Sequence, residues 1–502
     1  MQLTLLQKHF SGIFSFLLLT EHIYAQNASA SSIQSTTCGE QCQELARLGS
    51  SWEQTQHAHS PLDSFYSVPR TFSSSAEPGE LLRVELHTNL TNYTVPSGLT
   101  MSRIMYTSRD LNGTTVPVSA YILWPYTPFV PSEDGKPRRS SKGGHSRFPL
   151  VAWAHGTAGL FPACAPSNYR SLQYHFMVPY NVALEGFAVI APDYAGLGVG
   201  HLPNGDSIRH EYLAGPAAAN DLAYAIEAAR KAFPEQLTND GPFVAMGHSQ
   251  GGHVAWAFAE RQAVLPVAGY RGTISISPLT RVIDQVQAAR QIASSAPASS
   301  LPIWIPVTLS IQPKLVAAVT AVYPSYNYSG MTPVSYDRWN NVLAPVQGCL
   351  PTDGLVFSDV PIEGLVKPGW TEDRTVQDWA DRVAVSGKKF RGPLLVIVGD
   401  QDVVPLEGIE QAVDASCRVD SKEDLEQVTY AGMEHFPVIQ ASRMRWMDWI
   451  KERTIEQSWG GDGICGKKSF VEGYNTNYTL HPITPNWLVE AVNAEDAWQL
   501  AL

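Results

Sequence analysis

The chain has 502 residues, of which 44% are hydrophobic and 16% are charged, and its formal net charge is −12. This apolar content suffices for a packed core and excludes a disordered chain, and the absence of a repeating 20–50-residue period excludes solenoids and propellers. Because an acidic protein repels phosphate backbones, nucleic-acid binding is disfavoured, and any contact with lipid must be local and hydrophobic.

The N-terminus has the layout of a signal peptide. One positive charge at Lys8 precedes an apolar run from Ile13 to Leu19, after which the chain becomes polar. This run is shorter than the roughly 20 apolar residues that span a bilayer, so a membrane anchor is the weaker alternative. We expect cleavage after Ala25, which gives a signal peptide of residues 1–25, with 28–30 as an alternative site. The chain is therefore predicted to be secreted, and no later segment has the pattern of a transmembrane helix.

Two further patterns agree with secretion. Glycosylation sequons of the form N-x-[ST] begin at Asn27, Asn89, Asn92, Asn112, Asn327 and Asn477. The six cysteines are an even number, which predicts disulfides in an oxidising compartment, although six allow 15 pairings. Since the cysteines form no C-x-x-C pair, a zinc site is disfavoured and we expect no metal.

The first part of the chain divides into three stretches. Residues 26–78 are rich in Ser, Gln and Thr with little periodicity, so they are predicted to form an irregular N-terminal arm. Strand-like runs follow at 81–88, 101–107 and 116–125. A stretch at 131–147, full of Pro, Gly, Ser and basic residues, is then predicted to be a loop. The basic cluster at 136–139 within it is either a proteolytic processing site or, more simply, part of a solvent-exposed loop.

From Phe148 onward, short apolar runs alternate with helical patterns. The runs lie at 150–153, 187–190, 242–246, 273–276 and 394–398, and the helical patterns at 215–232, 251–261 and 438–451. Apolar strands without alternation, separated by helices, indicate a parallel sheet covered on both faces. We therefore predict an α/β core in two parts, residues 79–278 and 391–466, followed by a C-terminal extension at 467–502.

Residues 279–390 interrupt this rhythm. The segment is apolar and aromatic, and it is too long to be a structureless loop inside a globular domain. We interpret it as a cap inserted into the core.

The sharpest motif runs from Gly247 to Gly251 and reads Gly-His-Ser-Gln-Gly. It follows a predicted strand and opens a predicted helix, which is the context of the nucleophile elbow in an α/β-hydrolase fold. The two glycines suit a tight turn in which side chains would clash with the neighbouring strand and helix. Ser249 is therefore the predicted nucleophile, and His248 is expected to point away and to shape the turn.

A serine nucleophile needs a base and an acid that orients the base. In this fold they follow the serine in the order acid, then histidine. Asp402 follows the strand at 394–398 and is the predicted acid, whereas Asp400 is closer to the strand and better suited to shaping the turn. His435 follows the last strand of the core and is the predicted general base, with Glu434 as a structural neighbour.

The developing oxyanion needs two backbone N–H donors. One is expected from Gln250, the residue after the nucleophile, and the other from the loop that follows the strand at 150–153. This loop begins His155-Gly156-Thr157, and its small residues allow the backbone to approach the substrate. Either Gly156 or Thr157 is predicted to donate.

With these residues in place, the chain resembles the fungal secretory lipase family, the yeast lipase A type. The resemblance covers roughly Phe148 to Gly466 and rests on motifs in the family's order: Cys164–Ser167, Pro192–Gly198, the elbow around Ser249, Asp402–Pro405 and His435. It implies an α/β-hydrolase core with a helical cap over the active site. Two departures are an oxyanion loop without the family's acidic residue and a chain end, residues 476–502, that extends past the usual one.

The resemblance also implies two disulfides, Cys164–Cys349 and Cys417–Cys465, because these cysteines stand in the family's places. Cys38 and Cys42 have no such counterpart, and a bridge between them would be local.

The sequence thus predicts a secreted serine esterase or lipase with a mostly parallel central sheet and a large inserted helical cap. Ser249 would form an acyl-enzyme with a carboxylic ester that has a hydrophobic acyl or alcohol part, triacylglycerol included, and no cofactor is expected. The alternatives are an acyltransferase or tailoring esterase acting on a secondary metabolite, a serine peptidase of the same fold, and a catalytically inactive secreted binding protein. We expect an ester substrate, no nucleic acid and no stable membrane span, and the pattern predicts no oligomeric state.

Overall fold

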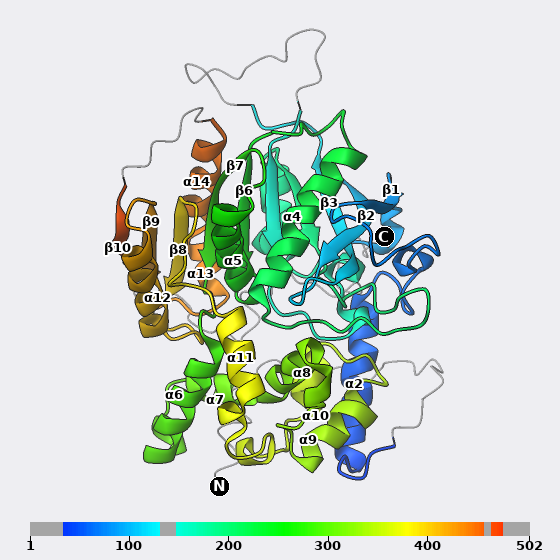
Figure 1. Ribbon diagram of the computed structural model, residues 1–502, viewed down its shortest axis with the longest axis vertical. Helices are drawn as coiled ribbons and strands as arrows, with labels where there is room; N and C mark the ends of the chain where they lie inside the picture. Colours follow the sequence, from blue (N-terminus) through cyan, green and yellow to red (C-terminus); the bar gives the residue numbers. More distant parts are fainter. Residues whose placement is uncertain (1–33, 131–146, 456–462, 475–502) are drawn as a thin grey trace.

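A computed structural model of the protein describes residues 34–130, 147–455 and 463–474 (Figure 1). The predicted signal peptide, the sequons at Asn27 and Asn477, and the basic cluster at 136–139 lie outside the described residues.

A ten-stranded sheet in the order β1-β2-β3-β5-β4-β6-β7-β8-β9-β10 forms the centre of the molecule. Strands β1 to β3 pair antiparallel, as do β3 and β5, and all pairs from β5 to β10 are parallel. The strands are β1 (Leu81–Glu85), β2 (Leu99–Arg109), β3 (Thr115–Pro125), β4 (Leu150–Ala154), β5 (Ala188–Pro192), β6 (Phe243–His248), β7 (Tyr270–Ile276), β8 (Leu394–Gly399), β9 (Leu425–Tyr430) and β10 (Cys465–Val471). The predicted mostly parallel α/β sheet is confirmed.

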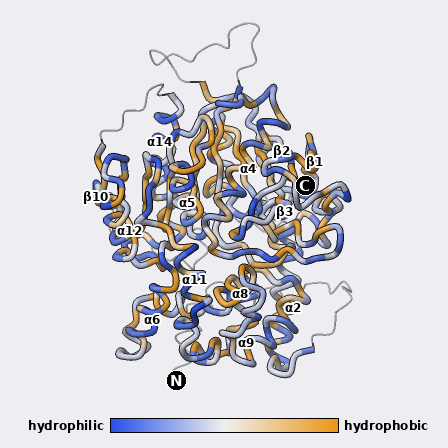
Figure 2. Tube along the Cα trace, in the orientation of Figure 1, coloured by the Kyte–Doolittle hydropathy of each residue, from blue (hydrophilic) through white to orange (hydrophobic). Residues whose placement is uncertain are grey.

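Helices cover both faces of this sheet, which explains why strands β4, β5 and β8 are apolar at every position. Strand β4 is buried along its whole length: Ala152 packs with one set of helices, whereas Val151 and Trp153 pack with the other. The first set is α4 (Gly215–Ala232), α5 (Gln250–Val264) and α12 (Leu406–Val419), and the second is α3 (Pro179–Leu184), α13 (Pro437–Ala441) and α14 (Arg443–Ile455). Figure 2 shows the resulting concentration of hydrophobic residues along the strands.

A helical insertion separates β7 from β8. Its α-helices are α6 (Val282–Ser295), α7 (Trp304–Ser310), α8 (Gln312–Val322), α9 (Pro333–Arg338), α10 (Leu350–Val356) and α11 (Arg374–Val383), and they lie below the sheet in Figure 1. The N–H of Leu350 donates to the carbonyl of Ala158, and Gly159 pairs with Cys349, so the insertion contacts the loop that follows β4. At its base, the N–H of Val385 donates to the carbonyl of Thr280.

Within the described residues, no single helix has the length and hydropathy of a membrane span. Helices α7 and α8 meet these criteria only as a pair, and they are bent by 44° where they join.

The prediction of an irregular arm at 26–78 is wrong for the segment that forms α2 (Glu40–Gln56). Its buried residues recur at helical spacing but include Gly49, Ser50 and Glu53, so the sequence has no apolar stripe to reveal the helix. Helix α2 packs on α10, and a Cβ added to Gly49 would lie 2.8 Å from Thr352 Oγ1. The carboxylate of Glu53 accepts the backbone N–H groups of Cys349 and Thr352, each at 2.9 Å.

The predicted boundary between core and C-terminal extension at 466 is also wrong, because it falls inside β10. This strand pairs in parallel with β9 at the edge of the sheet, none of its residues is buried, and two of them are exposed lysines. Lys467 pairs with Glu426, and Lys468 with Asp414. Charged side chains are common on edge strands because they oppose pairing with other chains, and here they conceal the strand from a search for apolar runs.

Three disulfides occur in the described residues. Cys164–Cys349 and Cys417–Cys465 each have Cα atoms 5.5 Å apart, and they have the pairing that the family resemblance implies. Cys38–Cys42 is a local bridge at the start of α2. The first joins the loop after β4 to the helical insertion, and the second joins α12 to β10.

We predict that stability falls with rising pH in part through Glu211. The pKa of this carboxyl is raised to about 8, mainly by burial and also by the charges of Asp110 and Asp221, while the Leu111 N–H and the Arg382 guanidinium oppose the rise. Since the folded pKa exceeds the ordinary value of 4.5, the protonated group stabilises the fold below pH 4.5, and this contribution is lost as the pH rises through 8. The Tm should fall between pH 5 and pH 8.5, and less steeply in Glu211→Gln.

The matched control is Glu235→Gln, which changes an exposed glutamate and should keep the wild-type slope. Equal slopes of Tm against pH for Glu211→Gln and wild type would contradict the prediction.

Candidate active site

Ser249 stands between the end of β6 and the start of α5. Its backbone has φ 59° and ψ −120°, a conformation that L-residues rarely adopt, and its N–H donates to the carbonyl of Ile276 at 2.9 Å. Strained backbone of this kind, at a turn from a strand into a helix, is the geometry of a nucleophile elbow.

The two motif glycines are required by the close approach of the backbone. A Cβ on Gly247 would lie 2.0 Å from the carbonyl oxygen of Gly251, and a Cβ on Gly251 would lie 1.9 Å from that of Ala154. Either side chain would push β4, β6 and α5 apart. The steric argument made from the motif alone therefore applies in the structure.

We predict that Gly251→Ala destabilises the protein by about 3 kcal/mol or more, because backbone rather than a flexible side chain blocks the methyl group. Denaturant unfolding followed by tryptophan fluorescence measures the loss. Gly39→Ala is the control, since a Cβ there meets nothing within 4 Å. A loss for Gly251→Ala no larger than that for the control would show that the elbow tolerates the side chain.

His435 lies in the loop between β9 and α13, and its Nδ1 is 2.7 Å from Asp402 Oδ1. Asp402 is buried, and two further donors hold it: the Ser277 hydroxyl at 2.6 Å from Oδ2 and the Val404 N–H at 2.8 Å from Oδ1. Asp400 instead accepts the N–H of Gly432 at 2.7 Å and so holds the turn after β9. The structure therefore brings Asp402, and not Asp400, to the predicted base.

The residue next to the nucleophile joins this group. His248 Nε2 is 2.8 Å from the backbone carbonyl oxygen of His435, and the two imidazole rings are 4.5 Å apart between centroids. The expectation that His248 points away is therefore wrong: as the last residue of β6, its side chain lies on the face of the sheet where the His435 loop passes. Glu434 has its pKa raised to about 7 by burial and by the nearby Asp402 charge.

The predicted oxyanion donors lie on two elements that meet the elbow. Gln250 opens α5, where the first backbone N–H groups have no intrahelical partner, and its side chain is directed to His210 Nε2 at 3.0 Å. In the loop after β4, the Gly156 N–H faces the Tyr174 hydroxyl oxygen, whereas the Thr157 side chain bonds the Tyr212 hydroxyl at 3.1 Å. The choice between Gly156 and Thr157 as the second donor stays a prediction.

The fold and this arrangement agree with the comparisons with known proteins. A model of the alpha/beta hydrolase family matches residues 150–439, more than half of the chain. The chain belongs to the alpha/beta hydrolase family. No curated protein sequence matches it.

Several solved structures share the fold of this alpha/beta hydrolase. Lipase A from Candida antarctica, in its closed state, is similar with a TM-score of 0.62 at 14% identity, over 85% of this chain and 94% of that one. The rice cell wall degrading esterase LipA from Xanthomonas oryzae has a TM-score of 0.54 at 18% identity, over 75% and 97%. A putative hydrolase from Legionella pneumophila has a TM-score of 0.55 at 14% identity, over 76% and 100%. The resemblance to the lipase A type is thus confirmed at the level of the fold.

A cavity of about 830 Å³ in this alpha/beta hydrolase lies away from the elbow. It is bounded by α2, the segment that follows it, the loop at 198–203 and part of the insertion, and Glu53, His57 and Asp63 are among its lining residues. Ser249, Asp402 and His435 do not line it. Its two acidic groups named here are paired, Glu53 with backbone N–H groups and Asp63 with Arg103.

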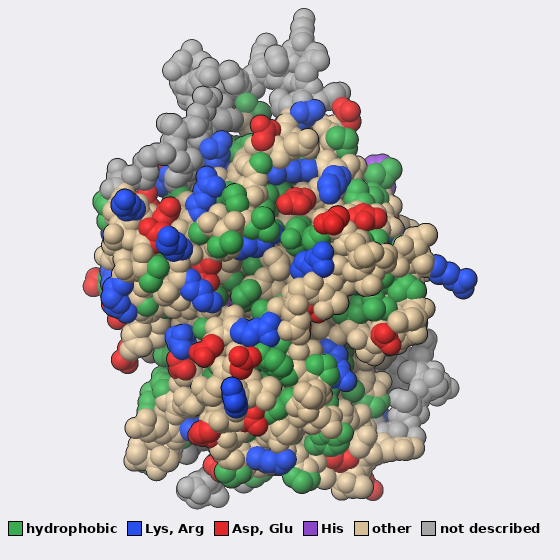
Figure 3. Space-filling model, viewed as in Figure 1, with side chains coloured by type: hydrophobic (Ala, Val, Ile, Leu, Met, Phe, Trp, Pro, Cys, Tyr) green, Lys and Arg blue, Asp and Glu red, His purple; other side chains and the backbone are tan. Residues whose placement is uncertain are grey.

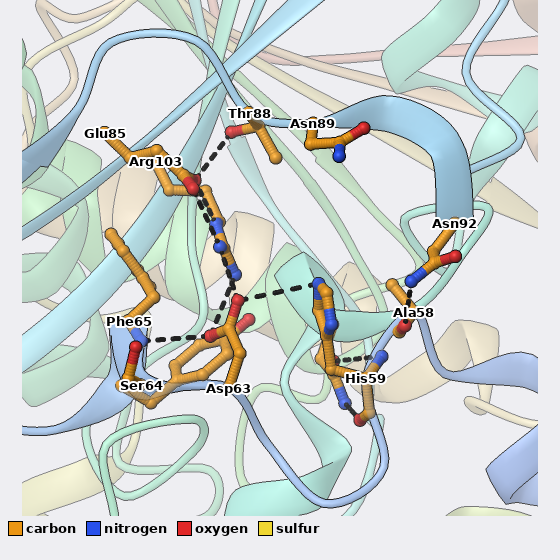
Figure 4. A network of polar contacts seen from close by, with 12 residues as sticks. Ala58, His59, Asp63, Ser64, Phe65, Glu85, Thr88, Asn89, Asn92 and Arg103 are labelled. Atoms are coloured by element: carbon orange, nitrogen blue, oxygen red, sulfur yellow. Dashed lines mark hydrogen bonds and ion pairs between the residues drawn. The ribbon is translucent and has the colours of Figure 1, made fainter.

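Four predicted glycosylation sites fall within the described residues, and all four asparagines are exposed: Asn89, Asn92, Asn112 and Asn327. Figure 4 shows the surroundings of the first two, where Arg103 bonds Glu85 and Asp63 and the Asn92 side chain donates to the carbonyl of Ala58. The Asn112 side chain donates to the carbonyl of Val322 in the insertion. Acidic and basic side chains alternate over the face drawn in Figure 3 and form no continuous basic surface there.

Sequence reasoning missed two residues of this site. Ser277 directly follows β7 at the edge of the sheet that carries the elbow, so its position after a buried strand was a usable signal. Tyr174 lies in an irregular segment between β4 and α3, where no periodicity or motif marks it. It contacts His248 through its hydroxyl.

Proposed function

We propose that the chain is a secreted serine ester hydrolase of the lipase or esterase type, with Ser249, Asp402 and His435 as its catalytic residues. The observation that carries the proposal is the 2.7 Å contact between His435 Nδ1 and Asp402 Oδ1 beside a strained elbow that holds Ser249. These three groups follow the chain order that this family uses for nucleophile, acid and base.

The geometry supports an acyl-enzyme mechanism. Asp402 accepts the Nδ1–H of His435, which leaves Nε2 free of a proton and able to take the Ser249 proton as the oxygen attacks an ester carbonyl. The N–H group of Gln250 and one from the loop after β4 stabilise the oxyanion. His435 returns the proton to the leaving alcohol, and a water activated in the same way releases the acid.

The substrate class follows from the helical insertion. We propose that residues 279–390 act as a cap over a core formed by 79–278 and a second part that begins at 391. Helix α8 of this insertion is apolar and buried along most of its length, which supports an ester with a hydrophobic acyl or alcohol part. Two similar structures are named lipase A and a cell wall degrading esterase, which supports ester chemistry for this fold.

Secretion forms the last part of the proposal. Three disulfides and the exposed sequon asparagines Asn89, Asn92, Asn112 and Asn327 support an oxidising compartment. We propose that residues 1–25 are removed as a signal peptide.

The test combines two assays on the full secreted chain. A fluorophosphonate probe should label the protein, and peptide mapping should place the label on Ser249. Hydrolysis of p-nitrophenyl esters of graded acyl length, from acetate to palmitate, should then give the length that the site prefers. Absence of both labelling and hydrolysis, or a label on another serine, would overturn the proposal.

A further inference from the structure

The imidazole of His248 connects two loops on either side of the elbow. Its Nδ1 is 2.8 Å from the Tyr174 hydroxyl oxygen, and its Nε2 is 2.8 Å from the backbone carbonyl oxygen of His435. Tyr174 comes from the irregular segment before α3, His248 from the end of β6, and His435 from the loop after β9. Three segments far apart in sequence are thus joined through one ring.

The direction of both hydrogen bonds follows from their atoms. A carbonyl oxygen can only accept, so His248 Nε2 must carry the hydrogen that it donates to His435. In a neutral imidazole, Nδ1 is then an acceptor, and the Tyr174 hydroxyl must donate to it. The ring is neutral because burial, with the nearby His435 adding to the effect, holds the pKa of His248 well below its usual range.

The chain of contacts continues from Tyr174 to the oxyanion loop. Burial raises the pKa of the Tyr174 hydroxyl, and the Gly156 N–H that faces its oxygen opposes this rise. A Cβ on Gly156 would lie 2.1 Å from that oxygen, so glycine is required at this position. The Tyr174 hydroxyl therefore packs against the loop after β4 and donates a hydrogen bond to His248, next to the elbow.

Packing keeps the pair in place. Tyr174 is 3% exposed and His248 is fully buried. The Tyr174 ring contacts Trp153 edge-on with centroids 5.1 Å apart, and Phe436 lies 5.3 Å from the His248 ring. Because the packing leaves neither side chain room to move, the loss of a polar group from one of them displaces its partner.

We propose that Tyr174 and His248 are positioning residues, which hold the backbone of His435 and the Gly156-Thr157 loop in register with Ser249. They do so through the close packing of Tyr174 on Gly156 and the hydrogen bonds from Tyr174 to His248 and from His248 to His435. The inference rests on the proposed function and adds to it the means by which the base and the oxyanion loop are aligned. Neither residue is placed to contact substrate. Asp402 sets the direction of the His435 ring, whereas His248 sets the position of the backbone that carries it.

Four variants test the inference. Tyr174→Phe removes only the hydroxyl, and His248→Leu removes both ring nitrogens. His248→Gln supplies an amide N–H for the His435 carbonyl and an amide oxygen for the Tyr174 hydroxyl, so it should restore part of the function. Tyr121→Phe is the matched control, because the Tyr121 hydroxyl is equally buried but has no hydrogen-bond partner among the described residues.

The first measurement is kinetic. Tyr174→Phe and His248→Leu should lower kcat for p-nitrophenyl butyrate, and the rate of fluorophosphonate labelling, by about 10–100-fold, since a misplacement of about 1 Å has effects of this size. The KM should stay within about twofold, because uniform substrate binding is untouched. His248→Gln should recover at least about threefold over His248→Leu, and Tyr121→Phe should match wild type.

The second measurement needs no activity. Hydrogen–deuterium exchange should be faster in the peptides that cover 155–159 and 432–437 in Tyr174→Phe and His248→Leu, and unchanged in Tyr121→Phe. Wild-type labelling with wild-type rates and exchange in both variants would overturn the inference and leave the proposed function standing. A wild type that is not labelled would overturn the proposed function, and the exchange data alone would then decide whether the path holds the two loops.

Discussion

Ser249→Ala and His435→Ala should each lower kcat/KM for ester hydrolysis by at least about 10⁴-fold. Either change removes one half of a proton transfer: without Ser249 there is no nucleophile, and without His435 no group takes its proton. Initial rates on the preferred p-nitrophenyl ester measure the loss. Because the two residues act as a unit, the double variant should be no slower than the slower of the two single variants.

The control for the histidine is His201→Ala, which changes an exposed ring and should leave the rate unchanged. A residual rate for Ser249→Ala above about one hundredth of wild type would contradict the assignment of the nucleophile. A double variant much slower than both single variants would instead show that the residues act separately.

Asp402→Asn should lower kcat by about 10³–10⁴-fold, whereas Asp400→Asn should lower it by less than about tenfold. The Asp402 Oδ1 lies 2.7 Å from His435 Nδ1, so an amide nitrogen in its place would favour the tautomer with hydrogen on Nε2, which cannot accept the serine proton. The Asp400 Oδ1 accepts the N–H of Gly432, which an amide oxygen does equally well. The two aspartates lie on the same loop, and the same substitution is made at each. The two variants therefore form a matched pair.

Parallel kinetics of both variants, with thermal melts to show that each is folded, decide the result. If Asp400→Asn were the slower enzyme, the acid of the triad would be misassigned. Equal small losses for both would mean that His435 needs no carboxylate.

The sequence alone predicted the parts of this molecule whose patterns are local. Strands β4 and β8 are short runs without polar residues, β6 is apolar up to its final His248, and a parallel sheet covered on both faces favours such runs. The carboxyl ends of these strands meet at one edge, so Ser249, Asp402 and the His435 loop were predictable from their position after a strand. The disulfides of the core and insertion were available only through the family resemblance.

The missed parts depend on contacts between distant segments. Helix α2 buries glycine, serine and glutamate against α10, so its periodicity lacks an apolar signal. Strand β10 lies at the edge of the sheet, and its two adjacent lysines interrupt the apolar run that would have marked it. The contacts of His248 with Tyr174 and His435 span 74 and 187 positions of the chain, and no spacing rule connects residues so far apart in irregular segments.

The packing of α2 on α10 sets a constraint on biosynthesis. Glu53 and Thr352 are 299 positions apart, so α2 is synthesised long before the surface that it covers. At about 5–20 residues per second, α2 waits roughly 15–60 s for the ribosome to supply α10. During that time the Glu53 carboxylate has no backbone N–H group from which to accept a hydrogen bond. The surface against which Gly49 packs has not yet been synthesised. The N-terminal segment therefore reaches its final packing only after α10 has been synthesised, although it leaves the ribosome first.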